Sequence, residues 1–147
     1  MTREDVVATA RGWLLPKTPW HHQASVKGVG CDCIGLIAGV ARELGVPEAA
    51  QWTRDPRRLS YGREPRPEML LAAASELLRK KDFPVQLGDI LLFIPPKGKL
   101  PQHFGIVSSQ VPLMMIHAYA QARKVVENSI DPDWFSRIVG VYCFKGL

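Results

Sequence analysis

The residue pattern changes character partway along the chain, and this change limits the possible folds. Apolar residues recur at helical spacing in three segments before residue 82, whereas short runs rich in β-branched and aromatic residues follow residue 87. Helices first and strands second indicate an α+β domain, with N-terminal helices packed on a C-terminal antiparallel β-sheet. The predicted helices cover 2–14, 32–44 and 67–81, and the predicted strands lie in GDILLFIP, HFGIVSS, PLMMIHAYA, KVVENSI and RIVGVYCF.

The length of 147 residues suits a single domain spanning 1–147, with enough chain for a hydrophobic core. Thr2 and Asp5 form a capping-box pattern at the start of the first helix. Residues 46–66 are rich in Pro, Arg and Gly and are predicted to form a long surface loop, which either covers a cleft or docks a partner.

Charge and hydropathy argue against nucleic-acid binding, a membrane span and a signal peptide. The net charge is +5, but the basic residues are scattered and no nucleic-acid-binding motif accompanies them. No apolar run is long enough to cross a bilayer, and MTREDVVATARGW lacks a signal-peptide core. We therefore expect synthesis in the cytoplasm, no membrane span, and no nucleic-acid partner. Work outside the cell then requires another export route, such as carriage in a larger assembly.

Two of the three cysteines lie at the start of the helix predicted over 32–44, in the stretch GVGCDCIGLIAGVARELG. Free N–H groups at a helix N-terminus stabilise an anion, so we expect the pKa of the Cys33 thiol to be lowered and its thiolate to be a nucleophile. Gly28 and Gly30 would let a ligand approach the backbone. Buried free cysteines are commonly inert, so Cys33 as a small core residue is the alternative.

Two other readings of the cysteine pair remain open. A Cys31–Cys33 redox pair would close a strained ring, and reactive pairs normally have two residues between them. A zinc site has enough sulfur and nitrogen ligands, but the spacing is tighter than usual and no second cysteine pair follows. The ligands available to such a site are Cys31, Cys33, His21, His22, His103 and His117.

A thiol nucleophile needs an imidazole base, and the base needs a group that orients it. His103 opens the run HFGIV, and His117 lies near the end of the run LMMIHAYA. If these runs are neighbouring antiparallel strands, both imidazoles lie on one face of the sheet. The sequence therefore predicts a site containing Cys33, His103 and His117.

The order of these motifs resembles that of the NlpC-type papain-like cysteine peptidases, which cut bacterial cell-wall peptides. The resemblance rests on the string Asp-Cys-x-Gly-Leu at a helix start, followed by GDILLF, HFGIV and IHA, and it covers nearly the whole chain. The stretch TPWHHQASVKGVGCDCIGL resembles more particularly the phage-tail and gene-transfer-agent branch of that family. The resemblance implies a papain-like form of the predicted α+β fold.

The resemblance also implies roles for individual residues. Cys33 corresponds to the nucleophile, His103 to the general base, and His117 to the residue that orients His103. Trp20 stands where the family usually has a tyrosine at the oxyanion site, and Ile34 replaces a serine that many members carry. Trp20, His22 and Asp32 are the predicted substrate-binding or oxyanion residues; Asp32 either meets a substrate amine or caps the helix.

The implied reaction is hydrolysis, through a Cys33 acyl-enzyme, of an amide bond in a peptidoglycan stem peptide between D-glutamate and diaminopimelate. It needs no cofactor and no metal. The implied partners are the stem peptide and the hub or baseplate proteins of a phage-like tail, which would carry the protein to the cell wall. The alternative is a catalytically inactive structural component of such a tail that keeps a papain-like fold.

Overall fold

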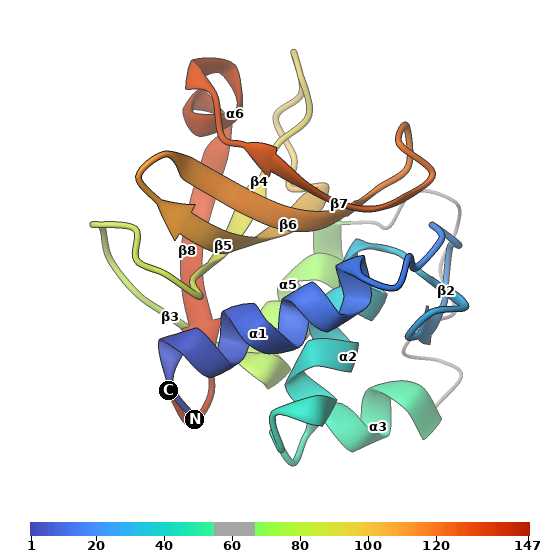
Figure 1. The fold of residues 1–147 in the computed structure, drawn as a ribbon. Helices are drawn as coiled ribbons and strands as arrows, with labels where there is room; N and C mark the ends of the chain where they lie inside the picture. Colours follow the sequence, from blue (N-terminus) through green and yellow to red (C-terminus); the bar gives the residue numbers. More distant parts are fainter. Residues whose placement is uncertain (55–66) are drawn as a thin grey trace.

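The computed structural model describes residues 1–54 and 67–147, which form a layer of helices against one face of a six-stranded β-sheet (Figure 1). The sheet is antiparallel throughout, with the strand order β3-β8-β4-β5-β6-β7. This arrangement confirms the predicted α+β class. The sheet strands are β3 (Leu78–Lys80), β4 (Ile90–Phe93), β5 (His103–Gln110), β6 (Leu113–Tyr119), β7 (Lys124–Ser129) and β8 (Ile138–Phe144).

In the described part of the chain, four helices and a small hairpin complete the helical side of the sheet. The longer helices pack on one another and on the sheet, and the two chain ends lie close together (Figure 1). The elements are α1 (Arg3–Leu14), α2 (Cys33–Glu43), α3 (Ala49–Arg54), α5 (Pro67–Leu77), β1 (Ser25–Val26) and β2 (Gly30–Cys31).

Helix α2 is buried on every side over its first nine residues, as expected of a helix that is apolar all round. At Gly39 an added Cβ would overlap the Trp13 ring of α1, so the glycine allows the two helices to approach closely. Helix α1 begins with the predicted capping box between Thr2 and Asp5. The nucleophile candidate is therefore carried by the most deeply buried helix of the fold.

Two predicted boundaries are wrong. The helix predicted over 67–81 ends at Leu77, because Leu78–Lys80 pair with β8 as the edge strand β3. The loop predicted over 46–66 contains helix α3, whose Trp52 is buried and donates its indole N–H to Glu76 at 2.9 Å. The part of that prediction covering 55–66 lies outside the described residues.

The two faces of the sheet are covered differently. Ile90 and Leu92 of β4 join the main core beneath the helices, whereas Leu91 and Phe93 join a smaller apolar cluster on the opposite face. The short helix α6 (Pro132–Ser136) lies on this second face (Figure 1). We call it the outer face, and it carries both sheet histidines.

A buried carboxylate connects three elements at the start of β4. Asp89 is fully buried and accepts from Arg3 of α1 at 2.8 Å and from Lys81, which follows β3, at 2.6 Å. The backbone N–H of Gln86 donates to the same carboxylate at 2.7 Å. These contacts hold α1 and the edge of the sheet together at the start of β4, whereas His103 pairs with Phe93 at the other end of that strand.

No helix among the described residues is both long and apolar enough to span a membrane.

Candidate active site

Asp32 positions Cys33 at the first turn of α2. One carboxylate oxygen of Asp32 accepts the backbone N–H of Gly35 at 2.8 Å, and the other accepts that of Gln23 at 2.8 Å. The helix can pass this close to the preceding loop because residue 35 is glycine; a Cβ there would overlap the carbonyl oxygen of Ala24. Asp32 therefore acts as the helix N-cap, one of the two roles predicted for it.

The Cys33 thiol is buried, and its electrostatics differ from the sequence expectation. Burial and the neighbouring Asp32 carboxylate raise its pKa to about 12, although backbone N–H groups of Phe104, Ile34 and Cys33 itself act in the opposite direction. The predicted lowering of this pKa is wrong, because removing the thiolate from water outweighs the helix N-terminus. The free protein therefore holds Cys33 as a neutral thiol at neutral pH.

The two sheet histidines are joined directly. Strands β5 and β6 pair with Ile106 opposite Ile116, and Nε2 of His103 lies 2.8 Å from Nδ1 of His117. The rings meet nearly edge to face, with centroids 5.0 Å apart. The structure thus brings His103 and His117 together as predicted.

A third residue extends this contact. Nε2 of His117 lies 2.7 Å from Oδ1 of Asn128 on β7. His117 pairs with Val126, so Asn128, two residues further along β7, projects from the same face of the sheet. We call Asn128, His117 and His103 the hydrogen-bond chain of the site.

Both imidazoles are neutral at neutral pH. Burial, aided by His117 and Arg137, lowers the pKa of His103 well below its ordinary value. Burial lowers the pKa of His117 to about 4, although the Asn128 contact opposes this. The site therefore rests as an uncharged thiol and two uncharged imidazoles, a state able to accept one proton on His103.

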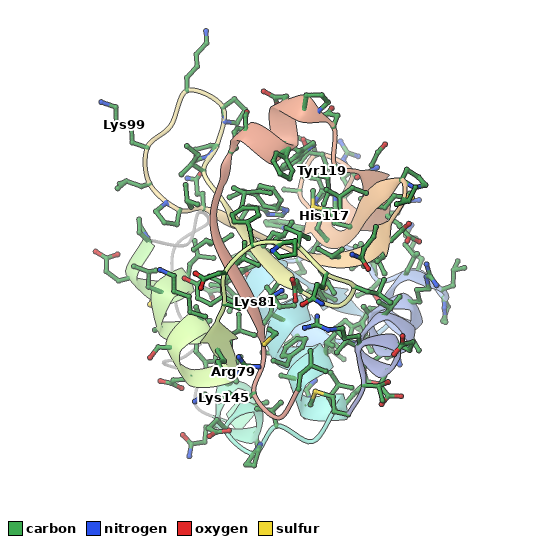
Figure 2. The ribbon with its side chains drawn as sticks, turned by 90° about the vertical axis from the view of Figure 1, so that its left-hand side faces the viewer. Arg79, Lys81, Lys99, His117, Tyr119 and Lys145 are labelled. Carbon is green, nitrogen blue, oxygen red and sulfur yellow. The ribbon has the colours of Figure 1, made fainter. Side chains whose placement is uncertain are left out.

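Aromatic rings enclose the histidines on the outer face. Trp134 of α6 contacts His103 and His117, with centroids 5.8 and 5.5 Å away, and Tyr119 stacks on His117 at 5.0 Å. Figure 2 shows His117 and Tyr119 side by side on β6. The Arg137 guanidinium lies over the Trp134 ring, 4.1 Å from its centroid. These rings shield the histidine pair on the outer face, while His103 stays partly exposed.

A cavity of about 720 Å³ opens beside these residues, and both Cys33 and His103 line it. Among the described residues no hydrogen bond joins Cys33 to His103. Trp20 and Asp32 also line the cavity. Trp20 is held there by its backbone N–H, which donates to the carbonyl of Arg123 at 2.8 Å, and by a bridge to Cys31.

The remaining predicted site residues do not line the cavity. His117 is fully buried behind His103, and His22 is exposed and stacked on His21 outside the cavity lining. Gly28 and Gly30 do not line the cavity either; Gly28 adopts a φ of +76° in the β1–β2 turn. The glycines therefore shape the hairpin rather than a substrate surface.

The two rival readings of the cysteine pair find no support. Cys31 and Cys33 are both free, and Cys31 is fully buried outside the cavity. The described residues contain no group of three or more histidine, cysteine, aspartate or glutamate side chains able to hold a metal ion. Of the side chains counted as zinc ligands, His103 contacts His117 and His21 stacks on His22, but the described residues bring no three of them together.

Sequence reasoning missed Asn128, Trp134 and Arg137. Asn128 had a detectable signal, because its spacing from Val126 places it on the His117 face once β7 pairs with β6. Trp134 and Arg137 had no such signal, since α6 is a helix of only five residues between β7 and β8. Their relation to the site depends on how α6 folds back over the outer face.

Solved structures resemble this chain over nearly its whole length. An NlpC/P60 family protein from Bacillus cereus matches with a TM-score of 0.65 at 17% sequence identity, covering 96% of this chain and 39% of that one. NlpC2 from Trichomonas vaginalis matches with a TM-score of 0.61 at 15% identity, covering 95% of this chain and 46% of that one. The chain has the NlpC/P60 fold. It spans less than half the length of these two proteins.

A third solved structure is similar in size to this chain. The NlpC/p60 domain of the peptidoglycan hydrolase SagA matches with a TM-score of 0.59 at 19% identity, covering 96% of this chain and 97% of that domain. No protein-family model matches the sequence, and no curated protein matches it significantly. The likeness is thus one of fold, and it agrees with the papain-like form that the motifs imply.

Proposed function

We propose that this chain is a cysteine endopeptidase that hydrolyses an amide bond in the stem peptides of peptidoglycan. The observation that carries the proposal is the shared cavity of Cys33 and His103, with His103 bound through Nε2 to a second histidine. That contact leaves Nδ1 of His103 as the nitrogen for the thiol. The peptidoglycan hydrolase SagA, whose domain has the same fold, supports the choice of substrate.

The neutral resting state defines how the reaction begins. His103 accepts the thiol proton as Sγ of Cys33 attacks the carbonyl carbon, so the ion pair forms during attack. The backbone N–H of Cys33, with the indole N–H of Trp20 as a candidate second donor, stabilises the oxyanion. His103 then gives its proton to the leaving amine, and the acyl-enzyme is hydrolysed by a water that His103 deprotonates.

The charge of the cavity favours an acidic peptide. Its described lining includes Arg123 and Arg137 and the carboxylate of Asp32, whose oxygens already accept two backbone N–H groups. Stem peptides carry free carboxylates, which an arginine binds well. We therefore assign the D-glutamyl–diaminopimelate bond as the target, with the substrate carboxylates directed toward the arginines.

We further propose that the protein acts from a phage-like or gene-transfer-agent tail, with hub or baseplate proteins as partners. The support is the resemblance of TPWHHQASVKGVGCDCIGL to that branch. Mass spectrometry of purified particles from the producing cells would find the chain at a fixed ratio to tail proteins. Its absence from particles would contradict the proposed association with a tail without affecting the enzymatic proposal.

The first prediction tests the nucleophile. Purified peptidoglycan is digested with wild type, Cys33→Ala and Cys31→Ala, and the released fragments are identified by mass spectrometry. Cys33→Ala removes the attacking atom, so we expect fragment release to fall to the limit of detection. Cys31→Ala is the matched control, and after correction for its folded fraction it should retain most activity.

The fragments also report the bond that is cut. New termini at D-glutamate and diaminopimelate support the assigned target. Equal loss in both folded cysteine variants would contradict the assignment of Cys33 as the nucleophile. A folded wild type that releases nothing would favour the structural tail component instead.

A further inference from the structure

Asn128 lies at the end of the hydrogen-bond chain, where its chemistry constrains both histidines. Its Oδ1 is 2.7 Å from Nε2 of His117, whose Nδ1 is 2.8 Å from Nε2 of His103. Asn128 itself is exposed on the edge strand β7, whereas His117 is fully buried. The contact with His117 is therefore not explained by packing of Asn128.

The direction of each hydrogen bond follows from the acceptor at the end. A side-chain carbonyl only accepts, so Nε2 of His117 carries a proton and donates it to Asn128. Because His117 is neutral, its Nδ1 then has a lone pair and accepts from Nε2 of His103. Because His103 is neutral too, its remaining nitrogen, Nδ1, is unprotonated.

We propose that Asn128 is a positioning residue whose side-chain carbonyl selects the tautomers of His117 and His103, so that Nδ1 of His103 holds the lone pair that takes the Cys33 proton. The inference rests on the proposed peptidase function and adds a residue to it. When Nδ1 takes the proton, His103 becomes an imidazolium whose Nε2–H still donates to His117. No proton moves to Asn128, so the chain returns to its starting state when His103 protonates the leaving amine.

The neutral amide has a consequence that a carboxylate would not share. An aspartate at position 128 would favour protonated His117, whose Nδ1–H would then face Nε2 of His103. That nitrogen would have to accept, which puts the proton of neutral His103 on Nδ1 and removes the base. Among the described residues, the other charged or titratable groups that face the pair or the cavity beside it are Tyr119 on β6, Arg123 before β7, Arg137 after α6 with its partner Asp133, and Cys33 and Asp32 at the start of α2. The change at 128 leaves all of these side chains in place.

The second prediction compares three single variants of the full chain: Asn128→Leu, Asn128→Asp and the neighbouring exposed Ser129→Ala as control. In Asn128→Leu the tautomers are no longer selected, so kcat should fall by up to about 10²-fold, the lower range for a positioned base, with KM unchanged. In Asn128→Asp the acid limb of the pH–kcat profile should move to higher pH, with activity recovering above it. Ser129→Ala should match wild type.

A spectroscopic measurement tests the same inference without turnover. Long-range ¹H–¹⁵N spectra of the histidine rings should show His103 and His117 both protonated on Nε2 in wild type and Ser129→Ala, and mixed tautomers in Asn128→Leu. A wild-type His103 protonated on Nδ1, or an Asn128→Leu protein with unchanged tautomers and kcat, would overturn the inference. If the tautomers respond as expected while no variant cleaves peptidoglycan, the positioning role stands and the proposed function fails.

Discussion

The two faces of the sheet divide the protein into a part that supplies stability and a part that carries the chemistry. The helix-facing side is continuous with the main core, and helix α1 is tied to the sheet through the buried Asp89, which two cations compensate. The outer face has a smaller apolar cluster, and beside it two neutral histidines lie under Trp134. Cys33 reaches the cavity from the helical side, so the site lies where the two parts meet. Changes on either face should therefore separate stability from catalysis.

The third prediction has the largest expected effect on stability. It concerns the buried carboxylate of Asp89, which ties helix α1 to the sheet. Asp89→Asn leaves Arg3 and Lys81 without their shared buried carboxylate, so the free energy of unfolding should fall by about 3–5 kcal/mol. Denaturant unfolding measures this, and kcat of the remaining folded protein should equal that of wild type.

The exposed pair between Arg11 and Glu127 is the matched control. Arg11 is 53% exposed, so Arg11→Gln should cost less than about 1 kcal/mol. A folded Asp89→Asn protein with strongly reduced kcat would show that the two faces are not separable.

The fourth prediction concerns the outer face and pH. His117 has a pKa of about 4 in the folded protein and about 6.5 when unfolded, so the unfolded chain binds the proton first as pH falls. Stability is therefore lost between pH 6.5 and 4, by about 3 kcal/mol from this residue. Denaturant unfolding at several pH values in this window measures the effect. The free energy of unfolding should fall more steeply with decreasing pH in wild type than in His117→Gln.

The exposed His22 provides the control for this comparison. His22→Gln should keep the wild-type pH dependence of stability, because its ring lies outside the buried pair. An unchanged slope in His117→Gln would mean that His117 does not carry the buried neutral imidazole assigned to it.

The fifth prediction, with the smallest effect, concerns the cavity between the two faces. Arg123 is exposed and lines the cavity, so Arg123→Gln should raise KM for peptidoglycan fragments about tenfold, the cost of one hydrogen bond to a charged group, with little change in kcat. Lys124→Gln removes the adjacent charge outside the cavity and should leave KM unchanged. Equal KM values for the two variants would contradict the proposed contact between Arg123 and a substrate carboxylate.

The order of the elements could be read from the chain because it depends on local pattern. The capping box of Thr2, the N-cap of Asp32 and the strands that begin or end near His103 and His117 all follow from residue spacing. The end of the helix at Leu77 could not be predicted, since Leu78–Lys80 become a strand only by pairing with β8, more than sixty residues later. Helix α3 was missed because six residues give little periodic signal.

The sequence by itself determined the fold class, the helix-mouth position of Cys33 and the two strands that carry His103 and His117. The tertiary structure alone decided the charge state of Cys33, the cover of Trp134 over the histidines and the contact from His117 to Asn128. The reason is physical. Spacing along the chain sets hydrogen bonds within an element, whereas burial and side-chain partners depend on which distant segments pack against it. The direction in which the pKa of a thiol shifts and the tautomer of an imidazole therefore depend on the tertiary structure.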